Sequence, residues 1–316
     1  MMEKDKKVAL IDMGTNTFHL LITQIQEGSE PNDLVRIKEP VKLGEGGISH
    51  GEIAPAAYAR ALQTLKGFKS LIDQHGAEEV KAMATSAVRN AANGPDLIQD
   101  IAAETGITVE IIDGDLEAEL IYYGVKSALE IGFEKSLLMD IGGGSVEFII
   151  CDDHQVFWKQ SFEIGAQRLL DKFFITDPLE EHAIEALKLY LQEQLTPLAE
   201  AVARCKPTVL IGSSGTFDTL CDIDSKRKGL DREQDCCPEA DLPLADFYEI
   251  YEDILRKNRS ERLAIPGMLE MRVDMIVMAI ILIDFVLENY SINKIRVSAY
   301  ALKEGMLYRM LNQEHK

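Results

Sequence analysis

Two segments of the chain repeat one pattern at an offset of 128 residues, residues 8–22 and residues 136–150. In each, an apolar run leads to an Asp, a Gly follows two residues later, and a second apolar run begins after a short polar turn. Two apolar runs joined by such a turn are typical of a β-hairpin. Because internal repeats reveal how a fold is assembled, we infer two related domains that face each other, with Asp12 and Asp140 in the turns that line the cleft between them.

Helical and extended patterns alternate along the rest of the chain. Residues 56–75 and 96–105 carry apolar side chains at helical spacing, and a glycine ends each run. Residues 80–84 and 107–112 have the composition of strands. This alternation predicts an α/β fold in which helices cover the faces of the sheets.

Composition limits the class of protein. The formal net charge of −20 argues against DNA, RNA and anionic membranes as main partners, because proteins that bind them carry clustered Lys and Arg. Five cysteines without C-x-x-C spacing follow no secretory signal, so we expect a reducing cytoplasm and interpret Cys236 and Cys237 as loop thiols. The most apolar run, residues 275–287, contains Asp284 and is shorter than the ~20 residues of a membrane-spanning helix, which predicts a buried core helix.

The turn of the second repeat, residues 142–145, has the composition of a phosphate cradle. Glycine amides can converge on an anion because no Cβ blocks the approach. Asp140 before the turn and Glu147 after it would suit Mg²⁺, which prefers carboxylate and phosphate oxygens. The alternative is that the glycines only shape a hairpin and that the Asp caps its turn.

A third small-residue segment, residues 212–216, joins an apolar strand at 208–211 to a helical run at 217–221. Amides at the N-terminus of a helix bind anions. Tightness alone also explains many Gly/Ser-rich turns between a strand and a helix, so this segment by itself leaves both interpretations open.

The helix that follows the strand at 107–112 carries the candidate general base. Glu117 falls on the same helical stripe as Ile121 and Gly124, where a carboxylate is out of place. If this side chain borders a cleft, desolvation makes it a better acceptor of a proton from water. The alternative is a glutamate of the first turn that faces solvent and interacts with the helix dipole.

Two cationic side chains are candidates for binding phosphate. Arg89 follows the strand at 80–84 and offers a planar fork of donors that matches phosphate oxygens. Lys42 precedes a glycine-rich segment. Either is also explained as an ordinary surface charge. His19, in the second apolar run, is interpreted as a core or supporting histidine and not as a nucleophile.

In order and spacing, these motifs resemble those of the exopolyphosphatase/guanosine pentaphosphate phosphatase family. The matching motifs are I-D-M-G-T-N-T-F-H at 11–19, A-T-S-A-V-R at 84–89, G-D-L-E-A at 114–118, D-I-G-G-G-S-V-E at 140–147 and G-S-S-G-T at 212–216. Segments at 265–268, 272–274 and 298–305 extend the resemblance over essentially the whole chain.

The resemblance implies an actin-like (ribonuclease H-like) fold of two related α/β domains, with mixed sheets flanked by helices and an active site in the interdomain cleft. We expect one domain at 1–124 plus 300–316 and the other at 125–299. The resemblance also implies hydrolysis of a terminal phosphoanhydride with Mg²⁺, or Mn²⁺, as cofactor. By position, Glu117 resembles the water-activating glutamate, Arg89 the phosphate-binding arginine, and Asp140 and Glu147 the metal-associated carboxylates. The expected phosphate-binding residues are Asp12, Gly14, Thr15, Asn16, Gly142, Gly143, Gly144, Ser145, Ser213, Ser214, Gly215 and Thr216.

We therefore expect a cytoplasmic, homodimeric exopolyphosphatase that releases orthophosphate from inorganic polyphosphate. The alternatives are a guanosine pentaphosphate 5′-phosphohydrolase, a non-catalytic module that binds nucleotide or polyphosphate, and a sugar kinase. The family commonly has two acids where this chain has Leu116 and Glu117, and the retained acid disfavours the non-catalytic module. Long members of the family carry a further C-terminal domain, and without it we do not expect processive handling of long polymers. Because the net charge of −20 repels a polyanion, a short or metal-complexed substrate is expected to suit better than a long naked chain.

Overall fold

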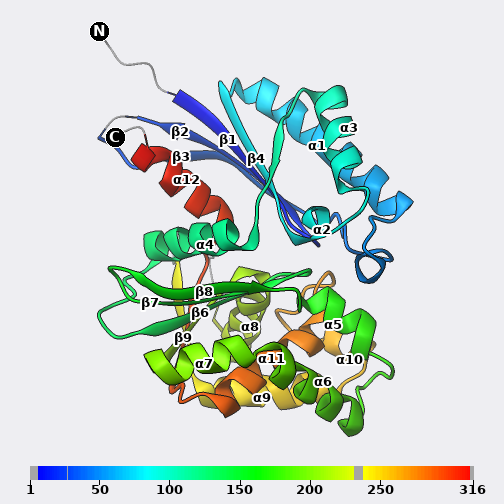
Figure 1. Cartoon of the computed structure of the whole chain (residues 1–316), viewed down its shortest axis with the longest axis vertical. Helices are drawn as coiled ribbons and strands as arrows, with labels where there is room; N and C mark the ends of the chain where they lie inside the picture. Colours follow the sequence, from blue (N-terminus) through cyan, green and yellow to red (C-terminus); the bar gives the residue numbers. More distant parts are fainter. Residues whose placement is uncertain (1–5, 27, 231–237, 314–316) are drawn as a thin grey trace. The chain divides into compact units, whose positions relative to one another are not determined.

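The computed structural model describes residues 6–26, 28–230 and 238–313. The chain forms two compact units that divide between Leu116 and Glu117 (Figure 1). The domain bounds expected from the sequence stay a prediction. Cys236 and Cys237 lie outside the described residues, whereas Cys151, Cys205 and Cys221 form no disulfide among the described residues.

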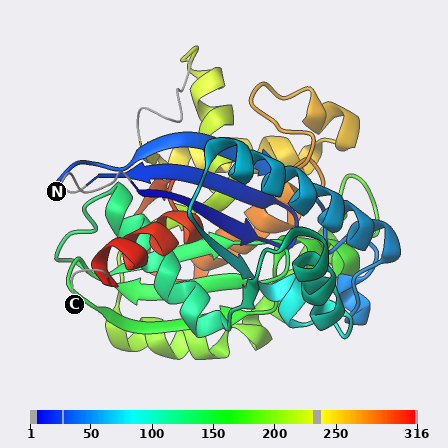
Figure 2. The same ribbon diagram turned by 90° about the horizontal axis from the view of Figure 1, so that it is seen from above.

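The first unit is built on a five-stranded sheet with the order β3-β2-β1-β4-β5. β1, β2 and β3 run antiparallel, and β4 and β5 run parallel to β1. Figure 2 shows α1 lying along this sheet. The helix buries one stripe of small and apolar residues, which packs into the core of the unit with the inner face of β1 and β2. The elements are β1 (Lys6–Met13), β2 (Phe18–Ile25), β3 (Asn32–Glu39), the 3-10 helix η1 (Ile48–His50), α1 (Pro55–His75), β4 (Glu79–Ala84), α2 (Ser86–Arg89), α3 (Gly94–Thr105) and β5 (Val109–Ile111).

The second unit is built on a six-stranded sheet with the order β10-β11-β9-β6-β7-β8. Figure 1 shows α4 on one face of this sheet and α7 and α11 on the other. Gly124 of α4 and Gly305 of α12 let these two helices cross closely. A Cβ on Gly124 would lie 1.9 Å from the Ala301 carbonyl oxygen, and a Cβ on Gly305 would lie 1.8 Å from the Leu120 carbonyl oxygen. The elements are α4 (Gly114–Ala128), β6 (Ser136–Ile141), β7 (Val146–Cys151), β8 (Val156–Phe162), α5 (Ala166–Phe173), α6 (Glu181–Gln194), α7 (Thr196–Cys205), β9 (Val209–Ser213), α8 (Ser214–Arg227), β10 (Glu239–Leu242), α9 (Leu244–Arg256), α10 (Arg259–Leu263), α11 (Met275–Asn289), β11 (Lys294–Ser298) and α12 (Leu302–Gln313).

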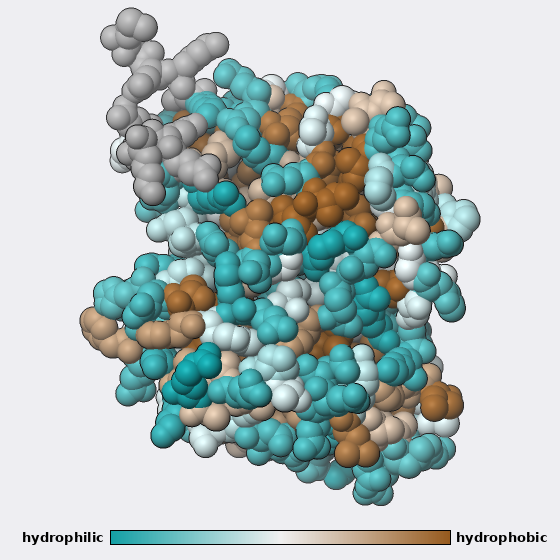
Figure 3. Space-filling view, in the orientation of Figure 1, coloured by the Kyte–Doolittle hydropathy of each residue, from teal (hydrophilic) through white to brown (hydrophobic). Residues whose placement is uncertain are grey.

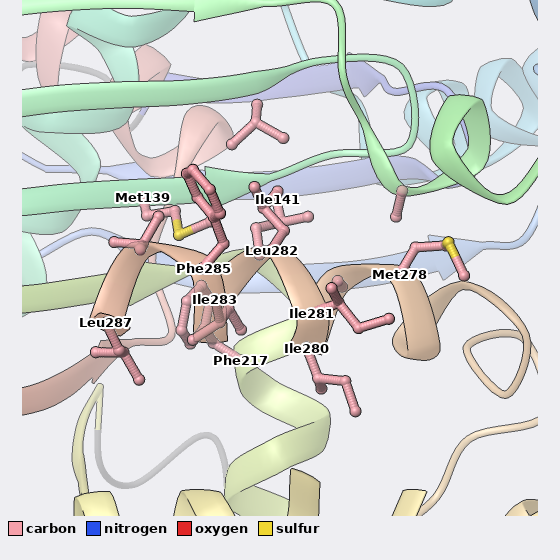
Figure 4. Packing of buried hydrophobic residues seen from close by; sticks show 14 of the residues in the cluster. Met139, Ile141, Phe217, Met278, Ile280, Ile281, Leu282, Ile283, Phe285 and Leu287 are labelled. Atoms are coloured by element: carbon pink, nitrogen blue, oxygen red, sulfur yellow. The ribbon is translucent and has the colours of Figure 1, made fainter. Parts of the chain in front are cut away.

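The apolar run at 275–287 forms α11, and every residue of that run is buried. Figure 4 shows its side chains against Met139 and Ile141 of β6 and near Phe217 of α8. The expected core helix is therefore confirmed. None of the helices within the described residues is long and apolar enough to cross a bilayer. In Figure 3 a hydrophobic patch crosses the visible face of the first unit, whereas the visible face of the second unit is mostly hydrophilic.

The sequence repeat corresponds to a repeat of structure. Met13 pairs with Phe18 at the end of the first hairpin, and Ile141 pairs with Val146 at the end of the second. In the first sheet β1 is flanked by β2 and β4, and in the second β6 is flanked by β7 and β9, with the same directions. Even the register irregularity recurs, after Ile22 in one unit and after Ile150 in the other. The expected α/β class with mixed sheets and flanking helices is confirmed.

The segment at 212–216 differs from the prediction of a separate turn. β9 continues to Ser213 and α8 begins at Ser214 without an intervening loop. Ser214 makes this possible because its backbone is left-handed, with φ of 71°, so a single residue reverses the direction of the chain. A non-glycine residue pays for this conformation in strain, which often marks a functional position.

Candidate active site

A row of polar residues crosses the sheet of the second unit. Ser213 of β9 pairs with Asp140 of β6, Asp140 pairs with Glu147 of β7, and Glu147 pairs with Ser161 of β8. Residues at paired positions of neighbouring strands project from the same face of a sheet. The register of four strands therefore gathers two carboxylates and two hydroxyls on one face.

Hydrogen bonds within this row orient both carboxylates. Asp140 Oδ2 accepts bonds from Ser213 Oγ at 2.7 Å and from Ser214 Oγ at 2.6 Å. Glu147 Oε1 accepts a bond from Ser161 Oγ at 2.6 Å. Because Asp140 is 5% exposed and Glu147 is 1% exposed, these hydroxyls satisfy acceptors that water does not reach.

Glu117 of α4 joins the two carboxylates. It is 6% exposed, and it is close enough to influence the ionisation of Glu147. Burial raises the pKa of Glu147 well above its usual range, and the charges of Glu117 and Asp140 raise it further. Burial also raises the pKa of Asp140, against the opposing effects of the Ser214 and Ser213 hydroxyls and of Arg272. The structure thus brings together the three acids predicted for this unit.

The donor set of this cluster fits a hard divalent cation. A cation beside Glu147 would offset the charges of Glu117 and Asp140, which raise its pKa. Within the described ranges, no group of three or more His, Cys, Asp and Glu side chains is arranged to hold a metal ion. Mg²⁺ needs no such group, since it is commonly held by one or two carboxylates with water and substrate phosphate. Asp140 and Glu147 are the residues that would hold it.

The glycine-rich turn between β6 and β7 is braced by the start of α5. The carbonyls of Gly142, Gly143 and Gly144 accept hydrogen bonds from backbone amides of residues 165–167, at 2.9 to 3.1 Å. Arg168 Nε adds a bond of 2.8 Å to the Gly144 carbonyl. In a trans peptide the amide N–H points opposite to the preceding carbonyl. The amides of Gly143, Gly144 and Ser145 therefore point away from α5, in the arrangement that binds an anion.

The turn of the first unit is held in the same way. The carbonyl of Thr15 accepts from the Gly44 amide at 3.0 Å, and that of Asn16 accepts from the Lys42 amide at 2.8 Å. Thr15 and Asn16 are equivalent to Gly143 and Gly144 at the offset of 128 residues. Their peptide units therefore direct the following amides away from the bracing segment, as in the second unit. Thr17 Oγ1 is buried there without a hydrogen-bond partner among the described residues.

The remaining predicted residues of the first unit lie near this turn in the sheet. Asp12 is half-buried on β1 and pairs with His19 of β2, so His19 occupies the position equivalent to Glu147. Arg89 ends α2, is half-buried, and donates from Nη1 to the Ile112 carbonyl at 3.0 Å. The Lys42 side chain is exposed, and the contact of this residue with the turn is made by its backbone.

Arg272 is a residue of the site that sequence reasoning did not single out. It is 8% exposed, and a Cβ on Gly215 would lie 2.1 Å from its Nη2, so the guanidinium lies against the first turn of α8. Burial lowers the pKa of Arg272, while the charges of Asp218 and Asp140 oppose this shift. Its Nε is buried and has no hydrogen-bond partner in the described part of the chain. A buried cation at a helix N-terminus favours an anionic ligand.

The predicted residues are therefore placed in two groups. The first unit holds Asp12, Gly14, Thr15, Asn16 and Arg89, and the second holds Glu117, Asp140, Gly142, Gly143, Gly144, Ser145, Glu147, Ser213, Ser214, Gly215 and Thr216. Besides Arg272, sequence reasoning missed Gly165 and Arg168, which brace the glycine-rich turn. For Arg272 the signal in the sequence was the match of 272–274 to a family motif; Gly165 and Arg168 had no such signal.

Known proteins resemble this chain over nearly its whole length. The model of the Ppx/GppA phosphatase family matches residues 21–314. The chain belongs to this family. Among Ppx/GppA relatives, exopolyphosphatase 2 of Mycobacterium tuberculosis is 30% identical over 312 residues, which cover 95% of this chain and 97% of the relative.

Solved structures of the Ppx/GppA family are similar over nearly the whole chain. An exopolyphosphatase from Cytophaga hutchinsonii has a TM-score of 0.95 and 48% identity, with 98% of each chain covered. The Aquifex aeolicus member of the family has a TM-score of 0.81 and 25% identity, covering 99% of this chain and 100% of its own. The chain thus has the fold of the Ppx/GppA family, with the two α/β units that the sequence motifs implied.

Proposed function

We propose that this Ppx/GppA family member is an exopolyphosphatase, which hydrolyses the terminal phosphoanhydride of inorganic polyphosphate and releases orthophosphate. The observation that carries the proposal is the position of Glu117, buried beside Glu147 and Asp140 in the unit that also presents the amides of Gly143 and Gly144. Similar proteins named exopolyphosphatase support the choice of substrate. A proton acceptor next to an anion cradle is the minimum machinery for attack of water on phosphorus.

In the proposed reaction, Glu117 accepts a proton from the water that attacks the terminal phosphorus. The amides of the glycine-rich turn and the N-terminus of α8 bind phosphate oxygens, and Arg272 adds a buried positive charge. Mg²⁺, held by Asp140 and Glu147, would neutralise charge on the phosphate when bound; Mn²⁺ has the same oxygen preference. Such positioning and electrostatic stabilisation carry most of the acceleration in phosphoryl transfer. The role predicted for Arg89 in binding phosphate stays a prediction.

The Glu117→Gln variant tests the assignment. Loss of a general base typically costs about 10²–10⁴-fold in rate, so phosphate release should fall by at least about a hundredfold with excess Mg²⁺ present. Asp115→Asn is the matched control, because it removes one charge from an exposed position in the first turn of the same helix and should retain the parent rate. A Glu117→Gln variant with nearly full activity would remove Glu117 from this role.

The substrate is tested by measuring phosphate release in parallel from short polyphosphate, long polyphosphate and guanosine pentaphosphate. The proposal expects the fastest release from short polyphosphate, abolished by EDTA and restored by Mg²⁺ or Mn²⁺. Preference for guanosine pentaphosphate would reassign the substrate, and release from none of the three would favour a binding module. The expected homodimer and cytoplasmic location stay predictions, the first of which sedimentation measures directly.

A further inference from the structure

A hollow of 530 Å³ opens on the second unit between α4 and β8. Its size lies in the range of ligand-binding pockets of proteins, about 300–1,000 Å³. The residues that define its chemistry are four aromatic side chains and two lysines, namely Tyr122, Tyr123, Phe157, Trp158, Lys126 and Lys159. None of these residues belongs to the candidate active site.

The two walls of the hollow follow from the periodicity of its elements. Glu119, Tyr122, Tyr123 and Lys126 are spaced at i, i+3, i+4 and i+7, so α4 presents them on one face. The opposite wall is β8, which is the edge strand of the sheet. The hollow therefore lies where α4, which covers one face of the sheet, meets β8, the last strand of the sheet among the described residues.

The lysines make the hollow suitable for an anion. Lys126 Nζ donates to the Asp153 carbonyl at 2.6 Å and lies 6.0 Å from the centre of the Tyr122 ring. An ammonium has three donors, so Lys126 can keep this bond while donating to a ligand. Lys159 Nζ lies 3.1 Å from Glu119 Oε2. With two ammonium groups against one carboxylate, the lining disfavours a cationic ligand.

The aromatic lining narrows the class of anion. A bare polyphosphate or sulfate gains nothing from aromatic rings, whereas a nucleobase packs against them. Tyr123 already stacks on Tyr308 with ring centres 5.0 Å apart, and Lys135 Nζ lies 4.4 Å from the centre of the Phe157 ring, so one side of each of these two rings is occupied. A nucleoside monophosphate has both a planar base and a phosphate dianion in a molecule of suitable size. We propose that this hollow is a second ligand site that binds a nucleoside 5′-monophosphate, with the base against the aromatic residues and the phosphate at Lys126.

The position of the hollow suggests what the ligand would do. Glu119 lies two residues after Glu117 on α4, and Lys159 lies two residues before Ser161, which bonds Glu147. The Glu119–Lys159 ion pair therefore joins α4, which carries the proposed base Glu117, to β8, which carries the Ser161 that bonds Glu147. A bound nucleotide that engages Lys159 changes the rate of phosphate release. This regulatory part rests on the proposed function, whereas the binding itself does not.

Binding is measured through Trp158, which is the single tryptophan of the chain and lines the hollow. AMP, GMP and UMP are titrated against the intact protein while tryptophan fluorescence is recorded, with ribose 5-phosphate and tripolyphosphate as anions without a base. Monophosphates contain no phosphoanhydride bond, so the proposed hydrolysis does not consume them. We expect saturable changes with the nucleotides, weakened about tenfold in Lys126→Gln because a charged hydrogen bond is lost, and unchanged in Lys69→Gln on α1.

Each outcome decides the proposal. No change with any nucleotide up to about 1 mM, the weak end of specific binding, overturns it, as does an unaltered affinity in Lys126→Gln. If ribose 5-phosphate binds as tightly as the nucleotides, the hollow is a simple anion site. If the fluorescence depends on protein concentration alone, the hollow is a contact between copies of the chain. Either result overturns nucleotide recognition. Binding should persist in Glu117→Gln, so loss of hydrolysis there does not bear on this site.

Discussion

The buried carboxylate of Glu147 lowers the stability of the native state when it is ionised. Its carboxylate is 1% exposed and lies beside Asp140 and Glu117, which is why its pKa is raised well above the usual range. A folded-state pKa above that of the unfolded chain, about 4.3 for Glu, means that the native state holds the proton more tightly. The stability of the native state therefore falls as pH rises from the unfolded pKa to the folded one.

The Glu147→Gln variant should accordingly be more stable than the parent protein, by an amount that depends on pH. Both proteins should unfold alike near pH 4 and below, where the carboxyl is protonated in either state. The advantage of the variant should grow as pH rises and become constant above the folded pKa. Urea unfolding between pH 4 and 8 with EDTA present measures it, and a parent protein that gains stability relative to the variant over this range would contradict the prediction.

Gly165 is a second residue whose role follows from contact. A Cβ there would lie 2.4 Å from the Gly143 carbonyl atoms, although its φ of −59° suits any residue. Gly165→Ala should therefore lose about 1–3 kcal/mol of unfolding free energy through overpacking and raise KM, because the brace of the proposed phosphate-binding turn shifts. Gly67→Ala is the matched control. It lies exposed within α1 with open space around its Cα, and should gain up to about 1 kcal/mol of helix propensity. Thermal unfolding and phosphate release measure both variants.

At the scale of elements, one buried arginine ties together the segments that hold Arg272. Arg262 of α10 is 0% exposed and donates to Asp177 Oδ1 at 2.7 Å, to the Lys257 carbonyl at 2.6 Å and to the Val273 carbonyl at 3.0 Å. Val273 is the neighbour of Arg272 in the chain. α10, the segment before α6 and the segment before α11 thus share one guanidinium.

Removal of one partner of this pair should cost more than removal of both. Asp177→Ala leaves a buried charge without its carboxylate and should lose about 3–5 kcal/mol of unfolding free energy. The double variant Asp177→Ala with Arg262→Met replaces the charge by an apolar side chain of similar length and should recover part of this loss. Urea unfolding measures the cycle; additive losses in the double variant would show that the two side chains do not interact.

The elements that sequence patterns predicted are those with either a continuous buried apolar run or buried apolar residues at a regular spacing. β1, β2, α1, α3 and α11 all carry such a pattern, and their observed bounds differ little from the expected ones. β3 and β8 were not predicted, because neither has a run of buried residues that alternates with exposed ones. These two strands are stabilised by pairing with β2 and β7 at the edges of their sheets, which is information that a local pattern does not contain.

The same distinction applies to the site. Asp140, Glu147 and the glycine-rich turn were predictable because they belong to one continuous motif that recurs in the chain. The row from Ser213 to Ser161 depends on the register of four strands, and the contact of Arg272 with Gly215 joins segments that are distant in sequence. Neither arrangement has a local signature. Ser214 at the junction of β9 and α8 replaced the expected turn by a single strained residue.

At the scale of the whole molecule, duplication explains why two turns carry equivalent hydrogen bonds but different side chains. The offset of 128 residues preserves sheet order, register and the bracing of the turn. It does not preserve the acid at the position of Glu147, where the first unit has His19. The second unit alone therefore gathers the carboxylate cluster, and the two copies have diverged in chemistry while keeping one backbone.

The net charge of −20 gives a prediction for the encounter with substrate. A polyanion approaching an acidic protein is repelled over the Debye length, which shrinks from about 30 Å at 0.01 M salt to about 8 Å at 0.15 M. At a fixed concentration of free Mg²⁺, kcat/KM for long polyphosphate should therefore rise with NaCl over this range, and the rise for tripolyphosphate should be smaller. A fall with added salt for the long substrate would instead show that local positive charge dominates its approach.

The bracing of the glycine-rich turn has a consequence for how the molecule responds to acidity. Peptide N–H groups neither gain nor lose protons in the range where carboxylates do, so Gly143, Gly144 and Ser145 keep their donors while the neighbouring acids change charge. In the proposed reaction, phosphate binding and proton transfer therefore depend on different kinds of atoms. Any change of phosphate binding with pH is then expected to come from the charge of the ligand and of the neighbouring carboxylates, and not from the amides themselves.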